Sequence, residues 1–88
     1  MSAALLEELA FKDAMPQATN FNDYQVLRMA DVPEIHTKLV ASDAPPTGVG
    51  EVGVPTVAPA IANAVAQLTG KRLRHLPMTA DRVKKALA

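Results

Sequence analysis

A run of glycine and proline at residues 45–55, PPTGVGEVGVP, divides this sequence into two parts. Proline lacks a backbone N–H, and glycine loses much conformational freedom when it is fixed in regular structure. A run so rich in both residues fits neither the interior of a helix nor a central strand. Glu51 is its one charged residue. The sequence therefore predicts a constrained loop that holds a single carboxylate, with folded elements on both sides.

The residues before this loop predict one short helix and two strands. Leucines on one face of residues 2–10 indicate an amphipathic helix, and Ser2 is suited to be its N-cap. Residues 34–41, EIHTKLVA, alternate apolar and polar side chains as a half-buried strand does, and residues 24–29, YQVLRM, indicate a second strand. Between the helix and these strands, residues 11–23 predict a short extended piece and a loop.

The residues after the loop predict a helix, a short strand and a final helix. Residues 56–70 carry apolar side chains at helical spacing, and the helix accommodates Pro59 if it starts near Thr56. Residues 71–77 indicate a basic edge strand, and residues 79–88 a helix capped by its first residue. The expected fold is α+β, a single domain over residues 1–88 with about three helices and a small sheet of two to four short strands.

The apolar side chains of this sequence are mostly small. Hydrophobic residues make up 49% of the 88 residues, but only three are aromatic, and alanine and valine supply much of the rest. Small side chains bury little area each, and without cysteine no disulfide supports the fold. We therefore expect elements that pack against something larger than the chain itself.

The charges are unevenly distributed, although the formal net charge is zero. Residues 1–70 carry three bases and eight acids, whereas residues 71–88 carry six bases and one acid. No aromatic platform accompanies the basic end, so we interpret it as a solvated helix face and expect no nucleic-acid partner. No apolar run reaches the roughly 20 residues that span a bilayer, so we expect no membrane insertion. The N-terminus lacks a positively charged signal region, which makes the cytoplasm the default compartment.

The loop offers two kinds of chemistry. Gly48, Gly50 and Gly53 permit positive φ angles and close approach to a ligand, and a helix N-terminus follows them, which suits an anion or nucleotide phosphate. The spacing fits neither a P-loop nor a dinucleotide fingerprint, so a plain turn is the other interpretation. Glu51 stands among valines, and partial burial there suits a general base, whereas full exposure indicates an ordinary surface glutamate. No histidine or cysteine pair has ligand spacing, so we expect no metal site.

Two stretches resemble a known family. NFNDYQVLRMADVPEI at residues 20–35 and SDAPPTGVGEVGVPTVAPAIANAVAQLTGKRLRHLPMT at residues 42–79 resemble the C-terminal end of the large subunit of molybdenum hydroxylases. This is the xanthine dehydrogenase and aldehyde oxidase family, and the similarity is greatest to isoquinoline 1-oxidoreductase and related aldehyde-oxidising enzymes. It extends from about Ser2 to Leu87, and its most specific part is the Gly-Val-Gly-Glu loop.

The resemblance implies roles for four residues. In the family, the glutamate of this loop lies beside the molybdenum and acts as the general base in the hydroxylation of an aldehyde or an N-heterocycle, so Glu51 is implied as the catalytic residue. Gly48, Val49 and Gly50 match the backbone that approaches the molybdenum-pterin cofactor, of the molybdopterin cytosine dinucleotide type. The family usually has proline where Val52 stands, and a glycine-containing turn in the region where this chain has KDAMPQAT.

The resemblance also implies partners. A family large subunit is many times longer than this chain, and iron–sulfur clusters lie on a further subunit or domain. We therefore expect the isolated chain to be inactive and to bind no cofactor by itself. Its partners would be the rest of a large subunit and an iron–sulfur subunit, and export with a partner would place it in the periplasm. The alternative is a stand-alone interaction module without catalysis, which uses its basic end to bind an acidic partner.

Overall fold

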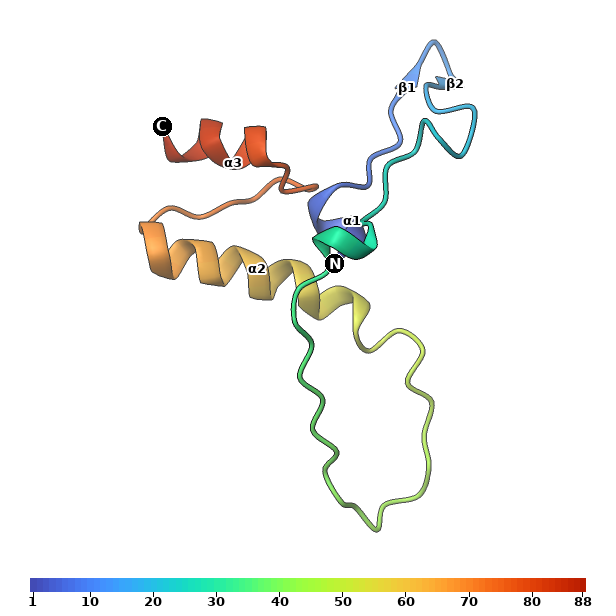
Figure 1. Ribbon diagram of the computed structural model, residues 1–88, viewed down its shortest axis with the longest axis vertical. Helices are drawn as coiled ribbons and strands as arrows, with labels where there is room; N and C mark the ends of the chain where they lie inside the picture. The colour runs from blue at the N-terminus through green and yellow to red at the C-terminus, as the bar shows by residue number, and fades with distance from the viewer.

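The computed structural model describes residues 1–88 and consists of helices and one small sheet joined by long connections (Figure 1). In chain order the elements are α1 (Ser2–Leu5), β1 (Phe11–Lys12), β2 (Met15–Pro16), the 3-10 helix η1 (Met29–Asp31), α2 (Val54–Thr69) and α3 (Ala80–Leu87). The expected class, α+β with three helices and a small sheet, is confirmed.

The sheet lies where the sequence indicated only an extended piece. Strands β1 and β2 pair in antiparallel orientation, with Phe11 opposite Pro16 and Lys12 opposite Met15. The turn between them places Asp13 and Ala14 at φ angles of 51° and 64°. A two-residue hairpin turn with two positive φ angles normally contains glycine or asparagine, and alanine there costs about 1–2 kcal/mol. The hairpin thus forms without the glycine, on a strained backbone.

The three strands predicted at residues 24–29, 34–41 and 71–77 are wrong as elements of this chain. The only sheet is the β1–β2 pair, and each of the three segments lacks regular strand structure. Alternating side chains show which face of an extended segment could be buried, but a strand also needs a neighbour that satisfies its backbone groups. No part of the chain supplies that neighbour.

Helix α1 is shorter than predicted because Ser2 has another partner. The helix ends at Leu5 instead of Ala10, and Met1 is its N-cap residue. The Ser2 hydroxyl accepts a hydrogen bond from the backbone N–H of Leu27, at 2.9 Å. The N-cap expected at Ser2 is therefore wrong, and this side chain joins α1 to the segment before η1.

Helix α2 begins one turn earlier than the proline argument required. It starts at Val54 with Gly53 as the N-cap residue, and Pro55 occupies the first turn, where its fixed φ angle suits a helix start. Pro59 consequently lies in the second turn, and the prediction that placed it in the first turn is wrong. The C-terminus is as expected, since Gly70 has a φ angle of 73° and its N–H donates to the carbonyl of Ala66.

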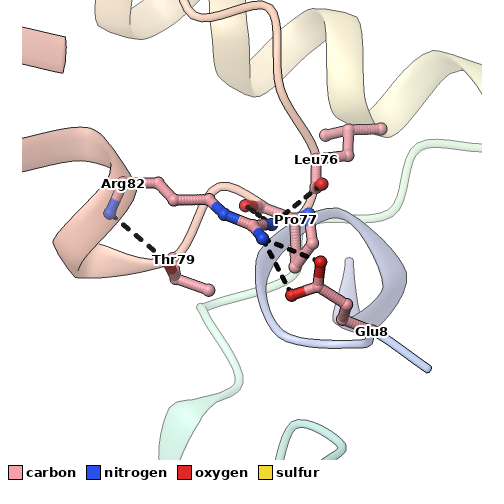
Figure 2. A network of polar contacts seen from close by, with 5 residues as sticks. All are labelled: Glu8, Leu76, Pro77, Thr79 and Arg82. Carbon is pink, nitrogen blue, oxygen red and sulfur yellow. Dashed lines mark hydrogen bonds and ion pairs between the residues drawn. The ribbon is translucent and has the colours of Figure 1, made fainter. Parts of the chain in front are cut away.

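The two ends of the chain meet at the root of α3. The backbone N–H of Met78 donates to the carbonyl of Ala4 at 2.7 Å, and both residues are buried. The Arg82 guanidinium donates to both carboxylate oxygens of Glu8, at 2.7 and 2.9 Å, and to the carbonyls of Leu76 and Pro77 (Figure 2). Thr79 caps α3 as predicted, with its hydroxyl accepting from the N–H of Arg82.

The remainder of the chain is open. Only three residues are buried, and the accessible surface is 7907 Å², against about 5,000 Å² for a compact protein of this mass. The Cα radius of gyration is 16.6 Å, whereas about 12 Å is typical of 88 residues in a compact domain. The thin core expected from the small side chains is therefore present, and residues 32–53 form a loop that extends away from the helices (Figure 1).

Candidate functional site

The Gly-Val-Gly-Glu loop is connected directly to the start of α2. The backbone N–H of Val54 donates to the carbonyl of Glu51 at 3.3 Å, and the hydroxyl of Thr56 donates to the carbonyl of Gly53 at 3.0 Å. These two bonds join the last part of the loop to the first turn of the helix. Helix α2 is the longest element of the chain, so it gives Glu51 the most regular support that the chain offers.

The side chain of Glu51 is exposed and makes no hydrogen bond or ion pair within the chain. The neighbouring valines do not cover it, because Val49, Val52 and Val54 are themselves exposed. The partial burial that would suit a general base is therefore not provided by this chain. A second body against the loop is needed to remove water from the carboxylate.

The loop glycines are not explained by the chain's own structure. Gly70 is the only glycine with a positive φ angle, so the positive φ angles expected at Gly48, Gly50 and Gly53 are wrong. A Cβ atom added at any of these three positions would meet no atom within 4 Å. Neither backbone conformation nor internal packing thus requires glycine here, and the space beside the loop is open to an external group.

An open groove of about 980 Å³ lies next to the loop. Its walls come from the N-terminal residues 1–4, from the first half of α2 and from residues 73–76, and they are mainly apolar. Val49 and Gly50 line this groove, whereas Gly48 and Glu51 do not. The structure thus places the four implied site residues on one loop, with two of them at the groove and the carboxylate outside it.

Arg74 and His75 are polar members of the groove that the sequence did not assign to any site. They lie more than twenty residues after the loop in the sequence. Their approach depends on the return of the chain alongside α2 after Gly70 (Figure 1). The side chain of Arg72, on the same returning segment, donates to Asn63 of α2 at 3.2 Å. No local pattern in the sequence indicates this proximity.

A carboxylate and a phenol interact at another place, where α1 meets residues 24–28. The hydroxyl of Tyr24 donates to the carboxylate of Glu7 at 3.0 Å. Hydrogen bonds from the Ser2 hydroxyl and then from Tyr24 lower the pKa of Glu7, and the same bond to Glu7 raises the pKa of Tyr24. These groups stabilise the packing of the N-terminal segment and lie apart from the glycine loop.

The side chains do not assemble a metal site of their own. No group of three histidine, cysteine, aspartate or glutamate residues is close enough to hold a metal ion. The nearest approach to such a site is His36 beside Glu34 at 3.4 Å, on an exposed part of the long loop. None of the helices combines the length and the apolar character that crossing a membrane requires.

No family model matches the chain. It is, however, 46% identical over 78 residues to the beta subunit of isoquinoline 1-oxidoreductase of Brevundimonas diminuta, covering 89% of this chain and 10% of that protein. It is 40% identical over 91 residues to the molybdenum-binding subunit of the aldehyde oxidoreductase of Escherichia coli strain K12, covering 94% of this chain and 12% of the relative. The chain is homologous to a segment of molybdenum-hydroxylase large subunits.

A further molybdenum-hydroxylase relative is a nicotinate dehydrogenase subunit of Pseudomonas putida, 36% identical over 87 residues, which cover 98% of this chain and 7% of that protein. The chain thus spans about a tenth of the length of the relatives that it matches. All three relatives are named as subunits, and the Escherichia coli protein is named as molybdenum-binding. The family resemblance seen in the sequence is confirmed over nearly the whole chain.

Proposed function

We propose that this chain is the C-terminal piece of a molybdenum hydroxylase large subunit and carries its general base, Glu51. The observation that carries the proposal is a lone exposed carboxylate without a partner in the chain. It lies on a loop whose glycines serve no purpose within the chain. Homology to about a tenth of a molybdenum-hydroxylase subunit supplies the context in which such a loop has a use.

The residues fit one wall of a cofactor site. Gly48 and Gly50 leave open space where a side chain would otherwise stand, and Val49 presents an apolar surface beside them. The chain has no set of metal ligands, so the rest of the site belongs to other parts of the enzyme. The group that fits is a molybdenum-pterin cofactor of the molybdopterin cytosine dinucleotide type, which supplies the two-electron oxidation when it is bound.

The contribution of the chain to the reaction is a proton acceptor. A carboxylate oxygen of Glu51 takes up the proton released as an aldehyde or N-heterocycle is hydroxylated, and covering the loop excludes water from that oxygen. The bond from Val54 to the carbonyl of Glu51 holds the backbone of this residue against α2. We assign substrate choice to the rest of the enzyme, because this chain adds a single carboxylate to the site.

The partners we propose are the remainder of the large subunit and an iron–sulfur subunit. The chain exposes about 2,900 Å² more surface than a compact protein of its mass, which is within the range of obligate interfaces. A stand-alone interaction module is supported less well, since such a module needs a core of its own and only three residues are buried here. The isolated chain is accordingly inactive.

The first test is native mass spectrometry of the tagged chain, isolated from its source cells at mild salt concentration. The proposal predicts that the chain arrives with a large molybdenum-containing subunit. A folded chain that arrives alone would contradict the proposal and support the stand-alone module.

Replacement of Glu51 by Gln in that complex tests the proton acceptor. Glu51→Gln removes the proton acceptor and keeps the shape of the side chain, so we expect kcat to fall by roughly 10²–10⁴-fold. Assembly and molybdenum content should stay unchanged. Asp43→Asn is the matched control, because it neutralises another exposed carboxylate of the same long loop. Activity that survives Glu51→Gln would show that the base is a different residue.

A further inference from the structure

Residues 34–41 form an exposed segment with two chemically different sides. Ile35, Leu39 and Val40 are 73%, 91% and 82% exposed. In an extended chain successive side chains point to opposite sides, which places Ile35, Thr37 and Leu39 together. The other side carries Glu34, His36 and Lys38, and His36 already lies 3.4 Å from Glu34. The segment therefore has one apolar side without a partner and one charged side suited to water.

The backbone of this segment is unpaired as well. No residue between positions 33 and 50 makes a backbone–backbone hydrogen bond. Residues 34–41 contain neither glycine nor proline, and three of the eight are β-branched, so their composition suits a strand. Loops longer than about 15 residues without regular structure are uncommon inside compact domains. A free row of N–H and C=O groups beside an apolar stripe is what a sheet edge accepts.

We propose that residues 34–41 add as a strand to an open sheet edge in the remainder of a molybdenum-hydroxylase large subunit. This inference rests on the proposed function, because it takes the same partner. The match to the Brevundimonas diminuta protein takes in 89% of the chain but only 10% of that protein, so most of the polypeptide that could cover the segment lies outside this chain. The charged side faces water, and the apolar side packs on the layer beneath the partner's sheet.

A second copy of this chain is a weaker occupant. Two copies of residues 34–41 would form a two-stranded ribbon, which is marginally stable in water without further strands or a helix to pack on. Such a ribbon also buries less than the roughly 1,200 Å² of a standard interface. A sheet edge in a large subunit offers both the hydrogen bonds and the packing surface.

Proline substitutions test the backbone pairing. The probe is the Brevundimonas diminuta subunit without the stretch that matches this chain, produced together with the full chain. Proline removes an N–H, so we expect His36→Pro or Thr37→Pro to weaken the complex at least about tenfold. Alternate N–H groups point to a neighbouring strand, so the two prolines differ at a sheet edge and both fail inside a sheet. The controls His36→Ala and Thr37→Ala keep the N–H and should change binding less than about threefold.

Three results would overturn the strand proposal. Binding that tolerates both prolines would show that no backbone ladder forms. Binding that falls equally with alanine and with proline would indicate a side-chain contact instead. A free chain that dimerises through residues 34–41, seen as slowed amide exchange that depends on chain concentration, would make the second copy the occupant.

Amide exchange in the intact Brevundimonas diminuta enzyme gives an answer even if the divided subunit does not assemble. The stretch that matches residues 34–41 should exchange at least about 100-fold more slowly than an open loop. Free exchange there would contradict the strand. Glu51→Gln should leave exchange and binding unchanged, so failure of the base assignment and failure of the strand proposal give different results.

Discussion

At the scale of single residues, Glu7 and Tyr24 make the folded state sensitive to pH. Hydrogen bonds lower the pKa of Glu7 below its ordinary value of 4.5, so its contribution to stability is present above that pH and is lost as the pH falls through the folded-state pKa. The bond to Glu7 raises the pKa of Tyr24 above 10.0, so its contribution is present below that pH and is lost as the pH rises through the folded-state pKa.

Urea unfolding as a function of pH checks both limbs. We expect the midpoint to fall on the acid side of 4.5 and on the alkaline side of 10.0, and Tyr24→Phe to reduce both losses because it removes the shared hydrogen bond. Asp23→Asn, next to Tyr24 in sequence, is the control for a general loss of charge. An unchanged pH profile in Tyr24→Phe would contradict this assignment.

Single residues also show what the sequence could predict. Gly70 and Thr79 end and begin helices through contacts within four residues, and both were predicted correctly. The bond between Glu7 and Tyr24 joins residues 17 positions apart, and no local rule finds it. The role of the loop glycines could not be judged from spacing, because what surrounds them lies outside the chain.

At the scale of elements, the three helices were predicted and the strands were not. A helix satisfies its backbone within itself, so periodicity and caps in the sequence suffice to find it. A strand needs a neighbour, and residues 34–41 have the alternation of a strand without one. The hairpin at residues 11–16 was missed because its turn contains Asp13 and Ala14 instead of glycine.

The attachment of α3 to the N-terminal segment depends on Arg82. Its guanidinium binds Glu8 and two backbone carbonyls together, a planar arrangement that lysine cannot reproduce. The side chains of Arg82 and Glu8 are 40% and 50% exposed, so solvent weakens the ion pair. We expect Arg82→Ala to lower the free energy of unfolding by about 1–2 kcal/mol, and Arg82→Lys by somewhat less.

Urea titration followed by circular dichroism measures this change. Lys85→Ala, one turn further along α3 and exposed, is the control and should stay within about 0.5 kcal/mol of the parent chain. A double-mutant cycle with Glu8→Gln should give a coupling energy of about 0.5–1 kcal/mol. No coupling would show that Arg82 acts only through the two carbonyls.

At the scale of the whole molecule, the exposed surface decides how the chain behaves alone. The apolar side chains that a compact protein would bury are spread over the long loop and the outer face of α2, where Leu68 is 87% exposed. Small side chains and three buried residues provide little stabilisation. The helices hold to one another mainly through the contacts at the root of α3, and the loop of residues 32–53 has no internal partner.

Small-angle X-ray scattering of the isolated chain tests this description. The Cα radius of gyration of 16.6 Å lies between about 12 Å for a compact domain and about 29 Å for an unfolded chain of this length. We expect a measured value near 17 Å, since the loop extends from a small folded body. A value near 12 Å would mean that the loop folds onto the helices and covers the chain's own apolar surface, which removes the need for a partner. A value near 29 Å would mean that the partner is required for folding as well as for catalysis, because burial of the exposed surface then supplies the stability that the chain lacks alone.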